Sequence, residues 1–354
     1  MFRRVLVATV LGITLAACGG SPTAPAIGAT PAVVRAGGGK VDPGYVTYES
    51  GSTTDAVTTA PLGGALLAGG GTDSDAGMKW LLAQGGTRGG VAGKYGDVVV
   101  LRTSGTNGYN KYLLNFGANS VTSIVITSTT GANSAYVVNA INKAEVIFIA
   151  GGDQSTYVGR WTGTALQNTV NQRVSAQIPI GGTSAGLAVL GEFVYSALNV
   201  STVSSVALAN PYDPSITFAR SLFTVPQLAN LITDSHFVTR DRMGRLVTFL
   251  ARLPRDYSGV ASPRGIGVDE QSAVGLTANG TATVFGAGAG VYLLKTGTLT
   301  DNVCQANTAL AFGPVTTSHV PVGASFSWSS WSYGTPYTLM AGGGTLTSSN
   351  GAVY

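Results

Sequence analysis

Short apolar runs alternate with amphipathic segments between residues 63 and 191, and this alternation restricts the fold more than any other feature of the chain. The apolar runs predict strands at GGALLAGG (63–70), DVVVLR (97–102), SVTSIVIT (120–127), EVIFIAGG (145–152) and IPIGG (178–182). The segments that follow them predict helices at 76–84, 107–117, 135–144, 164–174 and 184–191. Strands that alternate with helices favour a mostly parallel sheet with helices on both faces.

After about residue 275 the pattern changes to strand-like segments separated by Gly and Thr, as in TATVFGAGAGVYLL (281–294). We interpret these segments as antiparallel additions to the end of the sheet. The fold class predicted is therefore α/β, a three-layer α/β/α sandwich with antiparallel C-terminal additions.

The N-terminus, MFRRVLVATVLGITLAACGG, has two arginines before an apolar run and small residues before Cys18. This order is typical of a bacterial lipoprotein signal, with residues 1–17 removed and Cys18 lipidated. The alternative is an ordinary secretory signal with a cysteine at the cleavage site. We expect a cell-envelope lipoprotein attached to the membrane through Cys18. Cys304 then has no partner for a disulfide and is expected to be a buried thiol.

The formal charge of +4 is compatible with a nucleic-acid partner, but the distribution of the charges argues against one. Arg3 and Arg4 belong to the signal, and without them the 20 basic residues fall to 18, against 16 acidic ones. No run of Lys or Arg follows, so we expect no nucleic-acid partner.

Ser184 lies in G-T-S-A-G, directly after a predicted strand and at the start of a predicted helix. A tight strand-to-helix turn with small neighbours presents a serine hydroxyl above the sheet, as a nucleophile requires. A serine that caps the helix N-terminus is equally typical of this position. The motif alone leaves both interpretations open.

The chain has two histidines, which makes the search for a general base short. His319 lies in a segment rich in Thr and Ser without charged neighbours. His236 lies in ITDSHFVTRDRMGRLVTFL (232–250), between Asp234 and three arginines. Its polar surroundings favour His236 as the general base.

Two other patterns suggest ligands but favour simpler explanations. GGGTDSDAG (69–77) lacks the G-x-G-x-x-G spacing of a dinucleotide site and is more typical of a tight loop at the sheet edge. The tryptophans of SFSWSSWSYG (325–334) alternate with serines, which favours an edge strand with an aromatic face over a sugar-binding platform.

Four motifs in order, IAGGDQ (149–154), GGTSAG (181–186), DSHFVTRDRMGRL (234–246) and GIGVDEQSA (265–273), resemble the cyanophycinases of peptidase family S51, whose relatives include aspartyl dipeptidases. The resemblance covers roughly residues 60–295. It implies a class I glutamine amidotransferase-like fold and a serine peptidase. Cyanophycin, multi-L-arginyl-poly-L-aspartate, would then be hydrolysed to β-Asp-Arg dipeptides by an exo-acting enzyme.

The resemblance also implies the catalytic residues. Ser184 matches the nucleophile, His236 the base and Glu270 the acidic residue that orients the histidine. From the residues alone, Asp269 and Glu192 are equal candidates for the acidic partner.

A second set of residues is implied to bind substrate or the oxyanion. The substrate residues are Gln154, Asp234, Ser235, Arg240, Arg242 and Arg245. The backbone N–H of Ala185, with that of Gly152 or Asp153, is expected to form the oxyanion hole. Ser235 replaces a glutamine that the family often has, which points to a changed subsite and to other aspartyl or isoaspartyl peptides as an alternative substrate. We expect one of the three arginines to pair with Asp234 or Asp241 instead of contacting substrate.

The predicted organisation has four parts: a signal peptide at 1–17, a flexible Pro/Gly/Thr-rich tether at 18–58, an S51-like catalytic domain at 59–300 and a β-rich extension at 301–354 packed on that domain. The expected partner is a polymer or peptide that contains aspartyl residues, and a homodimer is a further possibility. We expect no cofactor and no metal. An inactive binding lipoprotein is the non-enzymatic alternative.

Overall fold

A computed structural model describes residues 43–354. The predicted signal peptide at 1–17 and the lipidation site Cys18 lie outside the described residues, as does most of the predicted tether.

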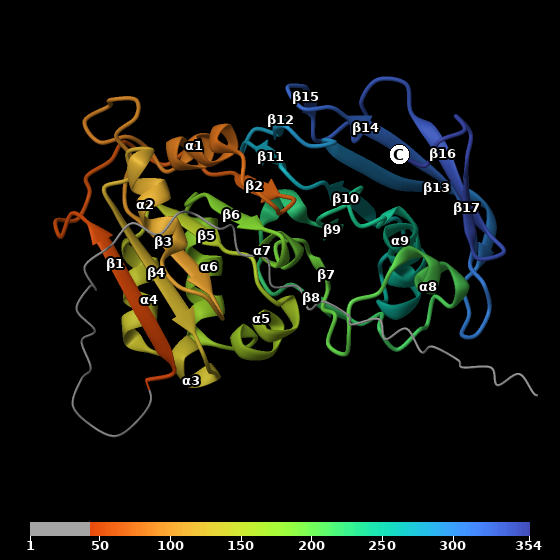
Figure 1. The fold of residues 1–354 in the computed structure, drawn as a ribbon, viewed down its shortest axis with the longest axis horizontal. Coiled ribbons are helices and arrows are strands. Elements are labelled where there is room, and N and C mark those ends of the chain that lie inside the picture. Colours follow the sequence, from red (N-terminus) through yellow and green to blue (C-terminus); the bar gives the residue numbers. More distant parts are fainter. Residues whose placement is uncertain (1–42) are drawn as a thin grey trace, which may run out of the picture.

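The first sheet holds the β-α alternation that the sequence predicts (Figure 1). Its strands are β1 (Tyr45–Gly51), β2 (Ala65–Ala68), β3 (Val98–Arg102), β4 (Ser120–Ile126), β5 (Val146–Ile149), β6 (Ile180–Thr183), β11 (Ser272–Leu276), β12 (Thr281–Gly286) and β15 (Ser325–Ser327). Their order across the sheet is β1-β4-β3-β5-β6-β2-β11-β12-β15. The five strands from β4 to β2 pair in parallel, and the outer strands pair antiparallel.

Helices cover both faces of this sheet. They are α1 (Asp75–Gln84), α2 (Gly108–Asn115), α3 (Thr129–Ala132), α4 (Ala135–Lys143), α5 (Gln154–Trp161) and α6 (Ala165–Ser175). Leu66 of β2 packs in one cluster with side chains of α1 and α2, whereas Leu67 packs in another with side chains of α4, α5 and α6. Neighbouring residues of a strand point to opposite faces. The predicted three-layer α/β/α arrangement is therefore confirmed for this sheet.

A second sheet follows, which the sequence pattern did not predict. Its strands are β7 (Phe193–Tyr195), β8 (Phe218–Arg220), β9 (Leu231–Asp234), β10 (Arg264–Val268), β13 (Val291–Val303), β14 (Ala311–Val320), β16 (Tyr337–Gly342) and β17 (Thr345–Ser348). They lie in the order β17-β16-β14-β13-β10-β9-β7-β8. The C-terminal strands β11, β12 and β15 extend the first sheet as expected, but β13, β14, β16 and β17 join β10 in the second.

The helices near the second sheet are α7 (Ala185–Ala188), α8 (Ser204–Ala209), the 3₁₀ turn η1 (Pro226–Leu228) and the longer α9 (Met243–Asp256). Leu246, Phe249 and Leu250 of α9 are fully buried in a cluster with side chains of β13, β14 and β16. A different cluster contains Leu67 and Val274 of the first sheet together with Val268 and Leu293 of the second. The two sheets therefore share a hydrophobic core.

The interpretation of residues up to 58 as a flexible tether was wrong for β1. This strand pairs along its whole length with β4, and Tyr45 stacks on Tyr136 of α4. The Thr, Tyr and Val residues of YVTYESG favour a strand. The prediction of a tether rested on the Pro and Gly residues of the longer segment around them. Pairing with an existing sheet edge stabilises the segment.

Candidate active site

Ser184 follows β6 on a turn with a strained backbone. Its φ of 53° and ψ of −117° lie where only glycine is comfortable. A Cβ on Gly182 would lie 2.4 Å from the carbonyl oxygen of Gly186, and one on Gly186 would lie 2.1 Å from that of Ile149. Only glycine is small enough at these two positions, so the G-T-S-A-G spacing is a requirement of the turn.

The Ser184 side chain makes no capping bond to the helix that follows it. Its Oγ lies 2.7 Å from Nε2 of His236 instead. Of the two interpretations open from the sequence, the geometry favours a serine paired with a base.

Thr183, the residue before the serine, is held by a partly buried chain of polar side chains. Its hydroxyl donates to Asp73 at 2.8 Å, and the hydroxyl of Tyr109 donates to the other oxygen of Asp73 at 2.6 Å. Burial raises the pKa of Asp73, and the two hydrogen bonds oppose that rise. Asp73 belongs to the GGGTDSDAG loop, which therefore supports the serine turn and does not follow a dinucleotide pattern.

His236 comes from the other sheet, directly beyond the end of β9. Its backbone is also in the left-handed region, with φ of 48°. Its N–H donates to the carbonyl of Gly69 at 2.8 Å, and a Cβ on Gly70 would lie 2.4 Å from its ring. The glycines after β2 let the chain pass directly against the imidazole, which is buried.

Glu270 lies on the connection from β10 to β11 and accepts from Nδ1 of His236 at 2.5 Å. Asp269 has a different function: its Oδ1 accepts the N–H groups of Val238 and Thr239, both at 2.9 Å. Glu192 pairs with Arg220 at 2.6 Å. Of the three acidic candidates, only Glu270 is hydrogen-bonded to His236 in the described part of the chain.

Burial lowers the pKa of His236 to about 4. Glu270 opposes this shift by bonding to the ring, while the cations Arg240 and Arg242 add to it. At neutral pH the imidazole is uncharged, as a residue that accepts a proton from serine must be.

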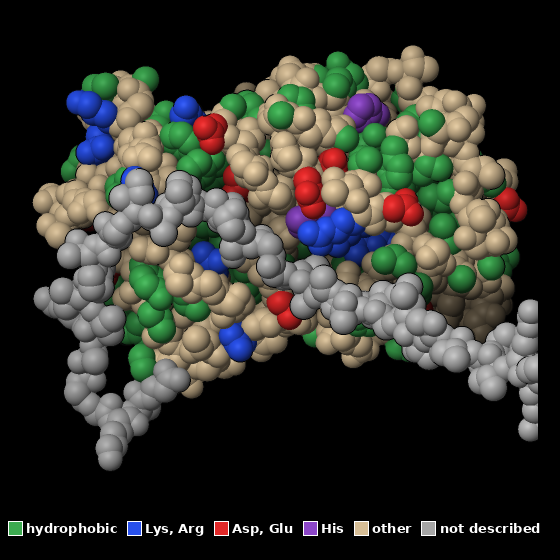
Figure 2. Space-filling view, viewed as in Figure 1, with side chains coloured by type: hydrophobic (Ala, Val, Ile, Leu, Met, Phe, Trp, Pro, Cys, Tyr) green, Lys and Arg blue, Asp and Glu red, His purple; other side chains and the backbone are tan. Residues whose placement is uncertain are grey.

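A cavity of about 550 Å³ opens beside this pair, and Ser184 and His236 both line it. Gln154, at the start of α5, and Ser235 line it as well, as do the three residues predicted for the oxyanion hole: Gly152, Asp153 and Ala185. Figure 2 shows cationic, acidic and histidine side chains gathered near the middle of this face. The oxyanion role of those three residues stays a prediction.

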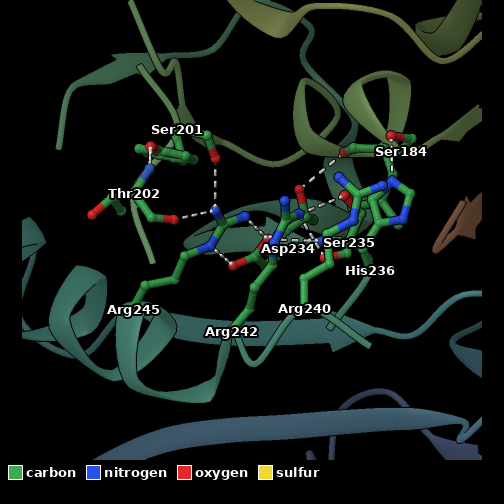
Figure 3. A network of polar contacts seen from close by, with 12 residues as sticks. Ser184, Ser201, Thr202, Asp234, Ser235, His236, Arg240, Arg242 and Arg245 are labelled. Atoms are coloured by element: carbon green, nitrogen blue, oxygen red, sulfur yellow. Dashed lines mark hydrogen bonds and ion pairs between the residues drawn. The ribbon is translucent and has the colours of Figure 1, made fainter. Parts of the chain in front are cut away.

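The three arginines of the DSHFVTRDRMGRL motif line the cavity and belong to one network of polar contacts (Figure 3), but they differ in burial. Arg245 is 2% exposed and binds both oxygens of Asp234, at 2.8 and 2.5 Å. Arg242 is buried and donates to the carbonyl of Ser235 at 2.8 Å. Arg240 has a side chain 39% exposed, with its Nε 3.6 Å from Glu270.

This difference in burial reduces the number of arginines that can contact substrate. Arg245 and Asp234 are occupied with each other, in agreement with the expectation that one arginine pairs with Asp234. A buried bidentate pair of this kind acts as a structural link. Arg240 and Arg242 stay the candidates for contact with a substrate carboxylate.

The segment after β7 also lines the cavity, and the sequence analysis did not identify it. Leu198 and Val200 of this segment line the cavity, as does Tyr195, the last residue of β7. Arg245 donates to the carbonyl of Thr202 at 2.9 Å, so the buried arginine links this segment to the end of β9. The sequence pattern of residues 195–203 does not indicate that this segment lies beside the cavity that contains Ser184.

His319 and the other predicted features lie elsewhere. His319 bonds to the carbonyl of Ala289 and stacks on Tyr292. Trp328 and Trp331 are buried and bond to backbone carbonyls, so they do not form a sugar-binding platform. Cys304 is a buried free thiol, as expected.

Within residues 43–354, no group of three His, Cys, Asp or Glu side chains is placed to bind a metal ion. No helix in the same part of the chain has the length and apolar character to cross a membrane.

Comparison with known proteins agrees with the motifs. Residues 106–206 match the model of peptidase family S51. This span contains Ser184 and Gln154, whereas His236 and Glu270 lie beyond it. A cyanophycinase from a Nostoc species is 28% identical over 181 residues, which are 51% of this chain and 55% of that protein. The cyanophycinase of Geminocystis herdmanii is 32% identical over 133 residues, 37% of this chain and 43% of that protein.

The chain is therefore similar to peptidase family S51 over residues 106–206 and to cyanophycinases over about half of its length or less. This finding confirms the resemblance that its motifs indicate. The chain spans about half the length of the curated relatives that it matches. Among solved structures, a peptidase from an acI-B1 Actinobacterium is similar with a TM-score of 0.48 and 15% identity, over 76% of this chain and 98% of that one.

Proposed function

We propose that this S51 relative is a serine peptidase that cleaves aspartyl-containing peptides through an acyl-enzyme on Ser184. One observation carries the proposal: Ser184 Oγ, His236 and Glu270 are joined by hydrogen bonds of 2.7 and 2.5 Å, and the serine lies on a strained turn beside a cavity. A nucleophile, a base and a group that orients the base are the parts of a serine triad.

The proposed reaction begins when Ser184 Oγ bonds to an aspartyl main-chain carbonyl carbon, while its proton passes to Nε2 of His236. The imidazolium that forms is stabilised by Glu270, which bonds to Nδ1. The C–N bond then breaks, and the proton passes from Nε2 to the leaving amine. Water attacks the resulting ester in the same way, releasing the acid and restoring Ser184.

The oxyanion of each tetrahedral intermediate is expected to be bound by backbone N–H groups. Ala185, the first residue of α7, directly follows the serine, and Gly152 and Asp153 line the same cavity from the end of β5. Donors placed before the reaction lower the barrier because they need no rearrangement when charge develops.

Two substrate classes suit this site. Cyanophycin is the first, supported by the names of the relatives. Its branches end in carboxylates, for which we propose Arg240 and Arg242 of the cavity lining as partners, and the products would be β-Asp-Arg dipeptides. Other aspartyl or isoaspartyl peptides are the second class, favoured by Ser235, a short side chain on the cavity wall.

The test is to incubate the purified full chain, and a Ser184→Ala variant, with insoluble cyanophycin. Soluble dipeptide released by the wild type and not by the variant supports cyanophycin as the substrate. No release, together with covalent labelling of Ser184 by a serine-directed reagent, favours the second class. No release and no labelling would contradict the peptidase proposal and favour a binding lipoprotein.

We also propose that the protein is a cell-envelope lipoprotein, on the basis of the signal-like N-terminus and Cys18. Cells grown with labelled palmitate should yield a labelled, membrane-associated protein. Cys18→Ala should remove the label, and a labelled Cys18→Ala protein would contradict the assignment. A homodimer stays a prediction that analytical ultracentrifugation tests.

A further inference from the structure

The segment 197–203 places exposed apolar side chains at the catalytic cavity. Leu198 is 55% exposed and Val200 is 53% exposed, and both line the cavity that holds Ser184. Large exposed aliphatic side chains gathered at one concave site are typical of a surface that binds an apolar group.

This segment is fixed in place by hydrogen bonds. The N–H of Leu198 donates to the hydroxyl of Thr217 at 3.0 Å, and the side-chain amide of Asn199 donates to the carbonyl of Pro214 at 2.7 Å. The N–H of Thr202 donates to the buried Tyr195 hydroxyl at 2.7 Å. Because these bonds hold the backbone on both sides of Leu198 and Val200, the exposure of the two side chains is a property of a fixed wall.

Arg245 extends this support to the catalytic residues (Figure 3). It reaches the carbonyl of Thr202 at 2.9 Å with one nitrogen and binds Asp234, two residues before His236, with two others. One buried side chain is therefore bonded both to the segment that carries the apolar wall and to the end of β9, which leads to the base.

The charges of the cavity do not suit a cationic side chain. The aspartates that line it are Asp153 and Asp234. Both oxygens of Asp234 are bound by Arg245, and those of Asp153 accept from Ser155 and Thr156 at the start of α5. Three arginines line the same cavity against these two aspartates, so its lining carries an excess of positive charge, and like charges repel in a partly buried site.

We propose that the substrate carries an aliphatic side chain, of the size of leucine, on the residue joined to the aspartyl group, and that this side chain packs on Leu198 and Val200. The inference rests on the proposed peptidase function and selects its second substrate class. A substrate carboxylate lies toward Arg240 and Arg242, and the apolar group lies toward the wall. The chemical steps are those already given for Ser184.

The experiment compares kcat/KM of the purified full chain on α- and β-linked aspartyl peptides that differ only in the adjacent residue: leucine, serine or arginine. We expect the leucine peptide to be cleaved at least about tenfold faster than the serine peptide, because burial of several methyl and methylene groups is lost in the latter. Equal rates for leucine and serine, or a preference for arginine, would overturn the proposal.

Two variants test whether the preference for leucine comes from Leu198 and Val200. Leu198→Ser and Val200→Thr should each reduce the ratio of leucine to serine rates several-fold, mainly through KM, with little change on the serine peptide. Val303→Thr is the matched control, since Val303 is an exposed aliphatic residue of β13 and does not line the cavity. An equal fall on both peptides, or an effect of Val303→Thr as large as that of Val200→Thr, would overturn the assignment of the wall.

The outcomes separate this inference from the function on which it rests. Cleavage without a leucine preference overturns the apolar wall and leaves the peptidase intact. No cleavage of any aspartyl peptide, with Ser184 still labelled by a serine-directed reagent, overturns the substrate class. No cleavage and no labelling overturn the proposed peptidase, and the inference with it.

Discussion

The two sheets contribute to the site in different ways. The first sheet supplies Ser184 on a turn set by residues within two positions of it, Gly182 and Gly186. The second supplies His236 at the end of β9, where its position depends on Gly69, Glu270 and other residues far along the chain. The glycines that permit the nucleophile's turn are therefore visible next to it in the sequence, whereas the residues that hold the base and the cavity wall are distant in the sequence.

Glu270→Gln should have the largest effect, because it leaves the shape of the site but removes the charge that stabilises the imidazolium. We expect kcat to fall by about 10⁴-fold. Steady-state kinetics on the best aspartyl peptide measures the change. Glu192→Gln is the matched control, because that carboxylate pairs with Arg220 instead, and its kcat should stay at the wild-type value. A similar loss in both variants would remove Glu270 from the triad.

Arg245→Met tests the tertiary support of the second sheet. It leaves Asp234 buried without its bidentate partner, so the free energy of unfolding should fall by about 3–5 kcal/mol. Arg240→Met removes an exposed arginine and should change it by less than about 1 kcal/mol. Urea denaturation compares the two. Equal losses of unfolding free energy in the two variants would contradict the claim that buried Arg245 stabilises the fold more than exposed Arg240.

Gly186→Ala tests the close packing of the serine turn against β5 in the first sheet. The added Cβ would meet the carbonyl oxygen of Ile149 at 2.1 Å, and backbone must move to relieve the contact. We expect a loss of about 1–3 kcal/mol in stability and a lower kcat from a displaced Ser184. Gly159→Ala in α5, where the added Cβ meets no atom within 4 Å, is the control and should be neutral or slightly stabilising. Thermal unfolding distinguishes them, and equal behaviour would contradict the steric account.

The smallest predicted effect is a shift in the pH profile of the Arg240→Gln variant. The base acts in its neutral form, so kcat/KM falls as the pH decreases through the pKa of His236, about 4. The Arg240 cation disfavours protonation of His236, so removing it should raise that pKa and move the acid limb to higher pH by less than about one unit. Arg220→Gln, which removes a similarly exposed arginine paired with Glu192, should leave the limb in place. A shift to lower pH in Arg240→Gln would contradict the sign.

The first sheet was largely predictable from the sequence, because its strands are buried apolar runs and its helices follow them directly. The turn at Ser184 was also predictable, because the spacing of its glycines is visible in the sequence. Glu270 was selected only by the resemblance to S51 peptidases, because its contact with His236 joins two different connections of the fold.

The second sheet was not predictable from alternation, because β10 could pair with β11 next in sequence but pairs with β9 and β13. The burial of Arg245 depends on Asp234 and on the segment at Thr202, which approach it only in the folded chain. Leu198 and Val200 carry no motif, and their place at the cavity depends on hydrogen bonds that their segment makes with distant residues such as Thr217 and Pro214.

Labelling of Ser184 by a fluorophosphonate is the most direct test of the central claim, that Ser184 and His236 form a nucleophile–base pair. Mass spectrometry of the wild type should find one modified serine, Ser184, and His236→Gln should label at least about 100-fold more slowly. Modification of a different serine, or equal labelling of Ser184 with and without His236, would contradict the claim.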